Sequence, residues 1–252
     1  MQPSQTPDRS DPPRHSARGP LVIRRLPPSP RAAVLLLHGG RADALEAPPA
    51  VNLPAVRLRP FASSIMRATR NDQVLVGRVR YRHRGWNGVR EDAVPDARQA
   101  LRAVVDTAGD VPVVLVGHSM GARAALRLAG EAQIKGVVAL APWCPPGEPL
   151  AEVGDRHLVA LHDGSDRVTV AEDTWEYLAR AERAGAYTLG VSMSKGGHAM
   201  VRDAHAWQHI TTSLVCGLLG LAPLPSALTD RGAPEGAPVT ARQLLAQLGG
   251  AS

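Results

Sequence analysis

Residues 113–116 are four consecutive apolar residues that lead directly into a turn of glycine and serine, and no other stretch constrains the fold as much. Such a run is typical of a strand buried on both faces of a parallel sheet. Residues 117–121 follow with the pattern G-x-S-x-G, and residues 122–129 then predict a helix that stops at Gly130. A strand, a sharp turn and a helix in this order lift the hydroxyl of Ser119 above the sheet edge, at the helix N-terminus. The stretch predicts a nucleophilic serine on a strained turn, against the alternative of a tight turn without chemistry.

Elsewhere, apolar runs that predict strands alternate with segments of helical periodicity. Strands are expected at residues 21–26, 32–37, 73–82, 134–140, 158–161 and 187–193, and helices at 57–69, 92–109, 170–184 and 203–219. This alternation predicts one α/β domain over residues 21–220, with a doubly wound, mostly parallel sheet and helices on both faces. Ligands of such sheets bind at the carboxyl ends of the strands.

The two ends of the chain differ from this domain in composition. Residues 1–20 contain five prolines and are expected to form a disordered arm. Residues 221–252 are rich in proline, glycine and alanine, apart from a weakly amphipathic piece around Leu244, Leu245 and Leu248. This piece is expected to dock either on the domain or on a partner.

Charge and cysteine content exclude several classes of function. The formal charge is +6, but arginine supplies all the basic residues except Lys135 and Lys195, and no nucleic-acid motif accompanies them. No apolar run is long enough to span a membrane, and the N-terminal residues lack the apolar region of a signal peptide, so we expect a cytoplasmic protein without nucleic-acid or membrane partners. Cys144 and Cys216 are far apart, which indicates neither a metal site nor a disulfide framework, and no cofactor is expected. The sequence does not indicate the oligomeric state.

A serine hydroxyl attacks at neutral pH only when an imidazole takes its proton, and the imidazole needs a carboxylate to hold its tautomer. Both partners follow in loops expected at the same sheet edge. Asp163 and Asp166 come after the strand at 158–161, and His198 comes after two glycines. The order serine, acid, histidine is that of the α/β-hydrolase fold.

The chain resembles the α/β-hydrolases over about residues 21–220, and in particular small bacterial, dienelactone-hydrolase-like members with little or no lid. The matching residues are His38-Gly39-Gly40, residues 117–121, Asp166-Arg167-Val168 and Gly197-His198. The resemblance implies a triad of Ser119, Asp166 and His198, with Asp163 as the rival acid. Asp163 stands where relatives more often have a glycine.

The resemblance also implies an oxyanion hole. Its donors would be the backbone N–H groups of Met120 and Gly40, with Arg41 as the alternative to Gly40. His38 and His118 are expected to have structural roles, and His205 and His209 are expected to lie on the surface or to pack.

Two tryptophans and an asparagine lie in loops expected at the same edge of the sheet. Trp86, Asn87 and Trp143 are predicted either to wall an acyl pocket or to pack within their loops. Residues 143–156 are too few for the cap domain that relatives often insert here, so the cleft is expected to be open.

These observations predict a lidless serine hydrolase that cleaves small-molecule carboxylic esters through an acyl-enzyme. A thioesterase and a lactone or amide hydrolase are alternatives within the class. A catalytically idle α/β-hydrolase fold used for binding is the alternative outside it.

Overall fold

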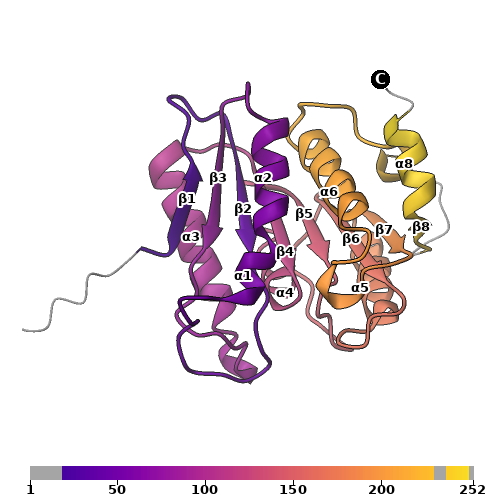
Figure 1. Cartoon of the computed structure of the whole chain (residues 1–252), viewed down its shortest axis with the longest axis horizontal. Coiled ribbons are helices and arrows are strands. Elements are labelled where there is room, and N and C mark those ends of the chain that lie inside the picture. The colour runs from indigo at the N-terminus through magenta and orange to yellow at the C-terminus, as the bar shows by residue number, and fades with distance from the viewer. Residues whose placement is uncertain (1–18, 230–236, 250–252) are drawn as a thin grey trace, which may run out of the picture.

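The computed structural model describes residues 19–229 and 237–249, and within them a single eight-stranded sheet organises the chain (Figure 1). The strand order is β1-β3-β2-β4-β5-β6-β7-β8, and only β1 runs antiparallel to its neighbour. The strands are β1 (Leu21–Arg25), β2 (Ala32–Leu37), β3 (Val74–Val79), β4 (Val113–His118), β5 (Ile134–Leu140), β6 (His157–Asp163), β7 (Tyr187–Met193) and β8 (Val239–Thr240).

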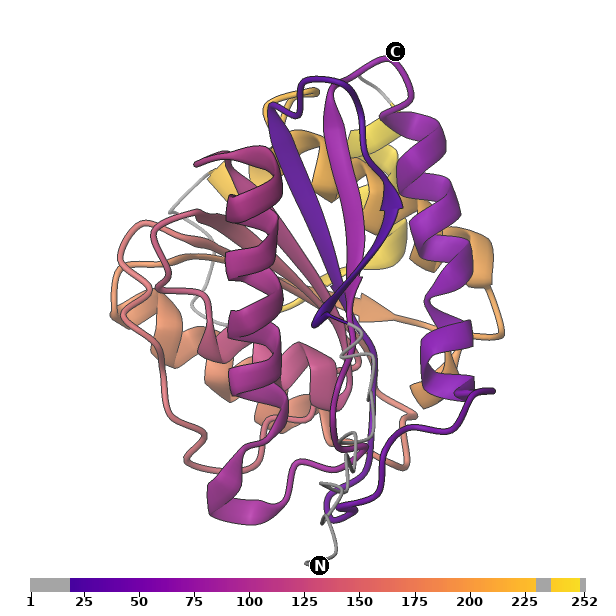
Figure 2. The same cartoon turned by 90° about the vertical axis from the view of Figure 1, so that its left-hand side faces the viewer.

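Helices cover both faces of this sheet, so that it lies between two helical layers (Figure 2). One layer consists of α3 (Ala93–Ala108), α4 (Met120–Arg127) and α5 (Ala171–Arg183). The other consists of α2 (Arg59–Ala68), α6 (Ala204–Leu218), α7 (Ser226–Thr229) and α8 (Ala241–Gly249). A short helix, α1 (Leu53–Arg57), precedes α2, and 3₁₀ turns lie at Gly88–Arg90 and Gly197–Ala199.

Side-chain alternation along the strands divides the apolar residues between two cores. In β2, Ala33, Leu35 and Leu37 face the layer of α3, whereas Val34 and Leu36 face the layer of α2. All six residues of β2 are buried, which explains the unbroken apolar run that predicted this strand. The predicted doubly wound sheet with helices on both faces is confirmed. No cap domain is present in the described residues, because the segment that joins β5 to β6 contains no helix.

The topology fixes where the site must lie. The chain passes from β2 outward to β3, and then crosses back over β2 to β4, so β2 and β4 are neighbours at the point where the strand order reverses. A crevice opens at the carboxyl ends of such a strand pair, because the connections that leave them run in opposite directions. The loop that starts at His38 leaves β2 here, and Ser119 follows β4.

The C-terminal segment set apart in the sequence at residue 221 contributes to the domain. β8 pairs in parallel with β7, and Leu244 of α8 is fully buried against the core of α2 and α6. A reciprocal cap starts α8: Thr240 N–H donates to Gln243 Oε1 at 2.8 Å, and Gln243 N–H donates to Thr240 Oγ1 at 3.3 Å. The amphipathic piece therefore docks on the domain.

The prediction of a single helix at 57–69 places the start of the helical segment wrongly. The structure has α1 at Leu53–Arg57, which begins before the predicted helix, and α2 begins at Arg59 after a break at Leu58. Pro54 and Pro60 each lie in the first turn of a helix, where a missing N–H costs nothing. The disorder predicted for residues 1–20 lies outside the described residues, except for Gly19 and Pro20.

Candidate functional site

Ser119 lies on a strained turn between β4 and α4. Its backbone angles are φ 54° and ψ −119°, a region that side chains other than glycine rarely adopt. Gly121 permits the turn, because a Cβ at this position would lie 2.2 Å from the carbonyl oxygen of Leu37. Helix α4 therefore packs directly on the end of β2, and the Ser119 side chain stands at the crevice between β2 and β4.

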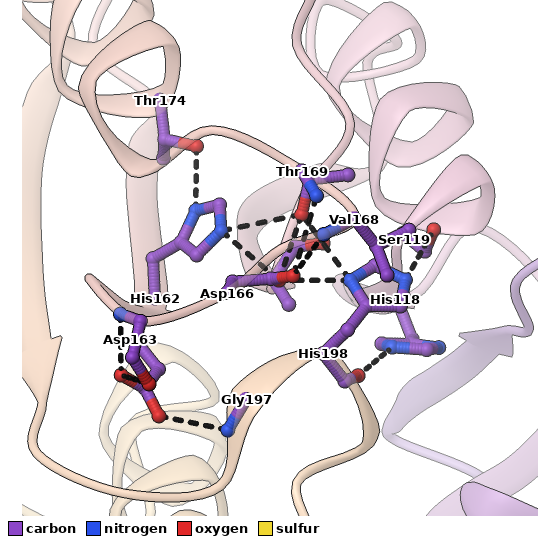
Figure 3. A network of polar contacts seen from close by, with 12 residues as sticks. His118, Ser119, His162, Asp163, Asp166, Val168, Thr169, Thr174, Gly197 and His198 are labelled. Carbon is purple, nitrogen blue, oxygen red and sulfur yellow. Dashed lines mark hydrogen bonds and ion pairs between the residues drawn. The ribbon is translucent and has the colours of Figure 1, made fainter.

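His198 connects Ser119 to Asp166 (Figure 3). Its Nε2 lies 3.0 Å from Ser119 Oγ, and its Nδ1 lies 2.8 Å from Asp166 Oδ2. The Asp166 side chain is fully buried, whereas that of His198 is 16% exposed. The three residues come from the carboxyl ends of β4, β6 and β7, and the structure brings them together in the order that the sequence suggested.

Asp166 is held as an anion by hydrogen bonds on both oxygens. Oδ1 accepts the N–H groups of Val168 at 2.8 Å and Thr169 at 3.3 Å, and Oδ2 accepts the hydroxyl of Thr169 at 2.9 Å. Burial alone would raise the pKa of Asp166, but the Val168 N–H bond and the adjacent His198 outweigh burial and lower it. An ionised Asp166 favours the His198 tautomer that carries its proton on Nδ1.

The rival acid, Asp163, does not contact His198. Its Oδ2 accepts the N–H of Gly197 at 2.7 Å, and its Oδ1 accepts both the N–H and the hydroxyl of Ser165 at 2.8 Å. Burial opposes ionisation, but the bonds from Gly197 and Ser165 prevail and lower the pKa of Asp163. Asp163 thus ties the acid loop to the histidine loop.

Two residues beside the acid were not singled out in the sequence. His162 is fully buried, and its Nε2 lies 3.3 Å from Asp166 Oδ2, while its Nδ1 lies 2.8 Å from the hydroxyl of Thr174. The Thr169 hydroxyl lies 3.2 Å from a ring nitrogen of both His162 and His198. The sequence could have pointed to His162, because it is the penultimate residue of the strand that leads into the acid loop.

His118 and His38 form structural contacts around this cluster. His118 Nε2–H donates to the carbonyl oxygen of His198 at 2.9 Å, which fixes the turn that carries His198 (Figure 3). His38 Nδ1 lies 2.7 Å from the carbonyl oxygen of Gly39. Burial lowers the pKa of His118 to about 3 and that of His38 to about 4, so both rings are neutral at neutral pH.

The loop after β2 passes directly beside Ser119. A Cβ on Gly39 would lie 3.3 Å from the Ser119 Cβ, and a Cβ on Gly40 would lie 2.4 Å from Met120 Sδ. Arg41 N–H already donates to the carbonyl oxygen of Arg84 at 2.9 Å, whereas no acceptor for Gly40 N–H occurs in the described part of the chain. Met120 N–H lies in the first turn of α4, where the helix offers no acceptor. Of the two candidates in the loop, this leaves Gly40 rather than Arg41 available as a donor.

The hypothesis that Trp86 and Asn87 wall an acyl pocket is wrong. Trp86 is 2% exposed, and the guanidinium of Arg123 covers its ring at 3.9 Å from the centroid. Asn87 is engaged within its own loop, where its side chain accepts Ala44 N–H and donates to Asp92. The Trp143 ring also lies against this guanidinium, at 4.5 Å, and makes an edge contact with the Trp86 ring, but Trp143 is only half-buried. Packing within the loops was the competing interpretation, and the contacts of Trp86 and Asn87 agree with it.

The remaining candidate residues lie away from the cluster. His205 and His209 are exposed on α6 and stack on each other, with centroids 6.1 Å apart. Among residues 19–229 and 237–249, no three histidine, cysteine or acidic side chains are grouped as metal ligands. No helix in these same ranges is long and apolar enough to cross a membrane.

Comparison of the sequence with protein families gives a match over part of the chain. The family model for serine aminopeptidase S33 matches residues 71–162, a range that includes Ser119 but neither Asp166 nor His198. A comparison with curated proteins gives no match.

Similar solved structures extend over most of the chain. They include a lidless α/β serine hydrolase from Xanthomonas campestris, with 14% identity, a TM-score of 0.55, and 81% of this chain and 90% of that one covered. An α/β hydrolase from a Medee basin deep-sea metagenome library has 18% identity and a TM-score of 0.59, covering 80% and 93%. A Pyrococcus furiosus esterase has 16% identity and a TM-score of 0.55, covering 76% and 82%.

Sequence identities this low establish the shared fold and not the activity. The fold, however, matches over nearly the full length of each of these proteins, and none of the described residues of this chain form a cap. The chain therefore has the α/β-hydrolase fold, and its described residues have the architecture of the proteins without a lid.

Proposed function

We propose that the protein is a serine hydrolase that cleaves carboxylic esters of small molecules through an acyl-enzyme. Ser119 is the nucleophile, His198 the general base and acid, and Asp166 the carboxylate that orients the imidazole. The backbone N–H groups of Gly40 and Met120 form the oxyanion hole.

In the first half of the reaction, Ser119 Oγ attacks the ester carbonyl carbon while its proton passes to His198 Nε2. The Asp166 carboxylate, 2.8 Å from Nδ1, stabilises the imidazolium that forms. The carbonyl oxygen becomes an oxyanion, which the two backbone donors bind. One such donor typically contributes about 3 kcal/mol of transition-state stabilisation.

In the second half, the tetrahedral intermediate expels the alcohol, which takes the proton from His198 Nε2. The serine ester that remains is attacked by water, which His198 deprotonates in turn. Collapse of the second intermediate releases the carboxylic acid and returns the proton to Ser119. Four proton transfers, each to or from the same imidazole nitrogen, thus complete the cycle without a cofactor.

One observation carries the proposal: Ser119 Oγ, His198 and Asp166 form a continuous chain of contacts of 3.0 and 2.8 Å. A binding module gains nothing from a serine held at a strained φ of 54° against the imidazole of His198. The absence of a cap in the described residues favours small esters that reach the serine from solvent. The Pyrococcus furiosus protein of the same fold is itself named an esterase.

The test is a substrate panel with matched variants. The panel contains p-nitrophenyl esters of graded acyl length, a thioester, a lactone and, because the matched family model is named for an aminopeptidase, an aminoacyl p-nitroanilide. The highest kcat/KM is expected on a p-nitrophenyl ester. Ser119→Ala and His198→Ala should lower kcat by about 10⁴-fold or more. Ser63→Ala, on the exposed side of α2, should leave it unchanged.

Two results would count against the proposal. Near-normal turnover by Ser119→Ala or His198→Ala would exclude the mechanism. A folded wild-type protein inactive on the whole panel would favour the idle fold, and a preference for the thioester, lactone or anilide would change the substrate class.

A further inference from the structure

A second concave site lies beside α1, between the end of β3 and the loop after β2. It contains about 550 Å³ of empty space, part of it open to solvent. Its lining includes Arg24 of β1, Arg59 of α2, and Arg78 and Arg80 at the carboxyl end of β3. A smaller cavity adjoins it and shares Arg24, Arg59 and Arg78.

Of the residues that the structure describes, no acidic one lines either cavity. Among residues 19–229 and 237–249, no carboxylate pairs with any of the four guanidinium groups. Other arginines of this chain do pair, such as Arg82 with Asp96 and Arg123 with Glu148. The four positive charges therefore face a common space without compensation from the described residues.

Arg78 experiences this accumulation of charge most strongly. It is half-buried, and burial, followed by the charges of Arg24, Arg80 and Arg59, lowers its pKa. Four cations around one space repel one another unless an anion lies between them. Guanidinium groups suit a phosphate in particular, because they bind its oxygens through paired N–H donors.

Polar groups of the lining suit the same kind of ligand. The Tyr81 hydroxyl is buried and has no hydrogen-bond partner in the described structure. Burial raises the pKa of Tyr81, so the hydroxyl keeps its proton and remains a donor. Asn52 Nδ2 lies 3.3 Å from His38 Nε2 at the same cavity.

We propose that this cavity is a binding site for a small doubly charged anion, with the phosphate group of a small molecule as the best-fitting ligand. Arg59, Arg78 and Arg80 supply the charge, and Asn52 supplies an amide. This site is separate from the three-residue cluster at Ser119, and the inference does not depend on the proposed esterase activity.

The site nevertheless touches the loop that the ester reaction would use. His38 lines the cavity, and its Nδ1 contacts the carbonyl oxygen of Gly39, next to the candidate oxyanion donor Gly40. The phosphate group has two possible sources: a separate effector that acts on the oxyanion loop, or an anionic part of the ester substrate itself.

Calorimetric titration with inorganic phosphate and pyrophosphate tests the site directly, and Ser119→Ala protein serves as well as wild type. We expect saturable binding that weakens with added salt. Arg78→Gln should weaken binding by about tenfold or more, and the double variant Arg59→Gln, Arg78→Gln should weaken it further. Arg67→Gln is the matched control, because Arg67 is an exposed arginine of α2 that does not line the cavity.

Thermal unfolding distinguishes anion binding by Arg59 and Arg78 from a role of these arginines in stabilising the fold. Without phosphate, Arg59→Gln and Arg78→Gln should melt no lower than wild type, because each substitution removes a repelling charge. With pyrophosphate, the melting temperature of wild type should rise and that of the double variant should not. The inference is overturned if neither anion binds saturably at millimolar concentration, or if Arg67→Gln weakens binding as much as Arg78→Gln does.

Kinetics with two activated esters, one neutral and one with a terminal phosphate, distinguish the two sources of the phosphate group. Substrate recognition predicts that Arg78→Gln raises KM for the phosphate ester alone and that pyrophosphate competes only with that ester. An effector predicts that pyrophosphate changes turnover of the neutral ester and that Arg78→Gln abolishes this change. Either pattern supports an anion site.

Discussion

His162 and His198 lie against the same oxygen of Asp166. His162 Nε2 is 3.3 Å from Asp166 Oδ2, and His198 Nδ1 is 2.8 Å from it. The pKa of His162 is lowered by burial, so its ring is neutral at neutral pH and donates one proton. With Thr174 on its other nitrogen, His162 acts as a positioning residue for the acid.

Removing this second imidazole should affect kcat more than KM. His162→Leu deletes the donor, and we expect kcat to fall by about tenfold or more, the equivalent of one lost hydrogen bond to a charged group. His162→Gln keeps a donor and should retain more activity. The acid limb of the pH–rate profile should also move in His162→Leu. Equal kcat values and pH profiles for wild type and both variants, at matched folded fraction, would show that His162 only packs.

The two aspartates of the acid loop should respond differently to loss of charge. Asp166→Asn removes the partner of His198 Nδ1 and should lower kcat by at least about 10²-fold, allowing for partial compensation by the second carboxylate. Asp163→Asn keeps an acceptor for Gly197 N–H, so kcat should change by less than about tenfold. Steady-state kinetics of both variants on one activated ester decide the assignment. If Asp163→Asn is the more damaged variant, Asp163 is the acid.

The Arg123–Glu148–Arg127 cluster should be important for stability. Glu148 is 1% exposed, and its oxygens lie 2.6 Å from Arg123 Nη2 and 2.6 Å from Arg127 Nε. Glu148→Gln removes the carboxylate that pairs with Arg123 and one of the two that pair with Arg127, the other being Glu91, at an expected cost of about 3 kcal/mol in urea unfolding. Glu176→Gln is the control, because Glu176 is 61% exposed and 4.0 Å from Arg180, a pair worth less than about 1 kcal/mol. Equal losses for the two variants would contradict this account.

Buried neutral histidines make stability depend on pH. His118 has an ordinary pKa of 6.5 in the unfolded chain and one of about 3 in the folded protein. As the pH falls below 6.5, the unfolded chain binds protons that the folded protein does not, so the free energy of unfolding decreases. Each such histidine contributes a slope of up to about 1.4 kcal/mol per pH unit.

Urea unfolding between about pH 6.5 and 5 measures this slope above the range in which carboxylates protonate. His118→Gln should flatten it, and so should a glutamine in place of His38, whose folded pKa is about 4. His205→Gln is the control, because it removes an exposed histidine instead of a buried one. An unchanged slope in His118→Gln would show that its ring protonates without cost to the fold.

The sequence predicted what depends on local pattern. The central strands β2 and β4 were visible because each is an unbroken apolar run, and Ser119 was visible because its turn has a fixed glycine spacing. The start of α8 could also have been found, since Thr240 and Gln243 have the spacing of a reciprocal cap.

Contacts between distant segments were not predictable in this way. Arg123 contacts both Trp86 and Trp143 because helix α4 meets two loops there, and no periodicity relates these residues. The four arginines of the proposed anion site come from β1, α2, β3 and the residue directly after β3, and only the folded sheet brings their charges together. The pairing of β8 with β7 likewise was not predictable from composition, because β8 pairs with an edge that exists only in the folded sheet.

The central claim is that Ser119 is an activated nucleophile, and labelling with a fluorophosphonate probe followed by peptide mass mapping tests it most directly. The account predicts one adduct on Ser119 in the folded wild-type protein and none in Ser119→Ala. Labelling should be slower by about 10³-fold or more in His198→Ala, because the base is lost. No adduct on Ser119, or labelling that is equally fast without His198, would contradict the account.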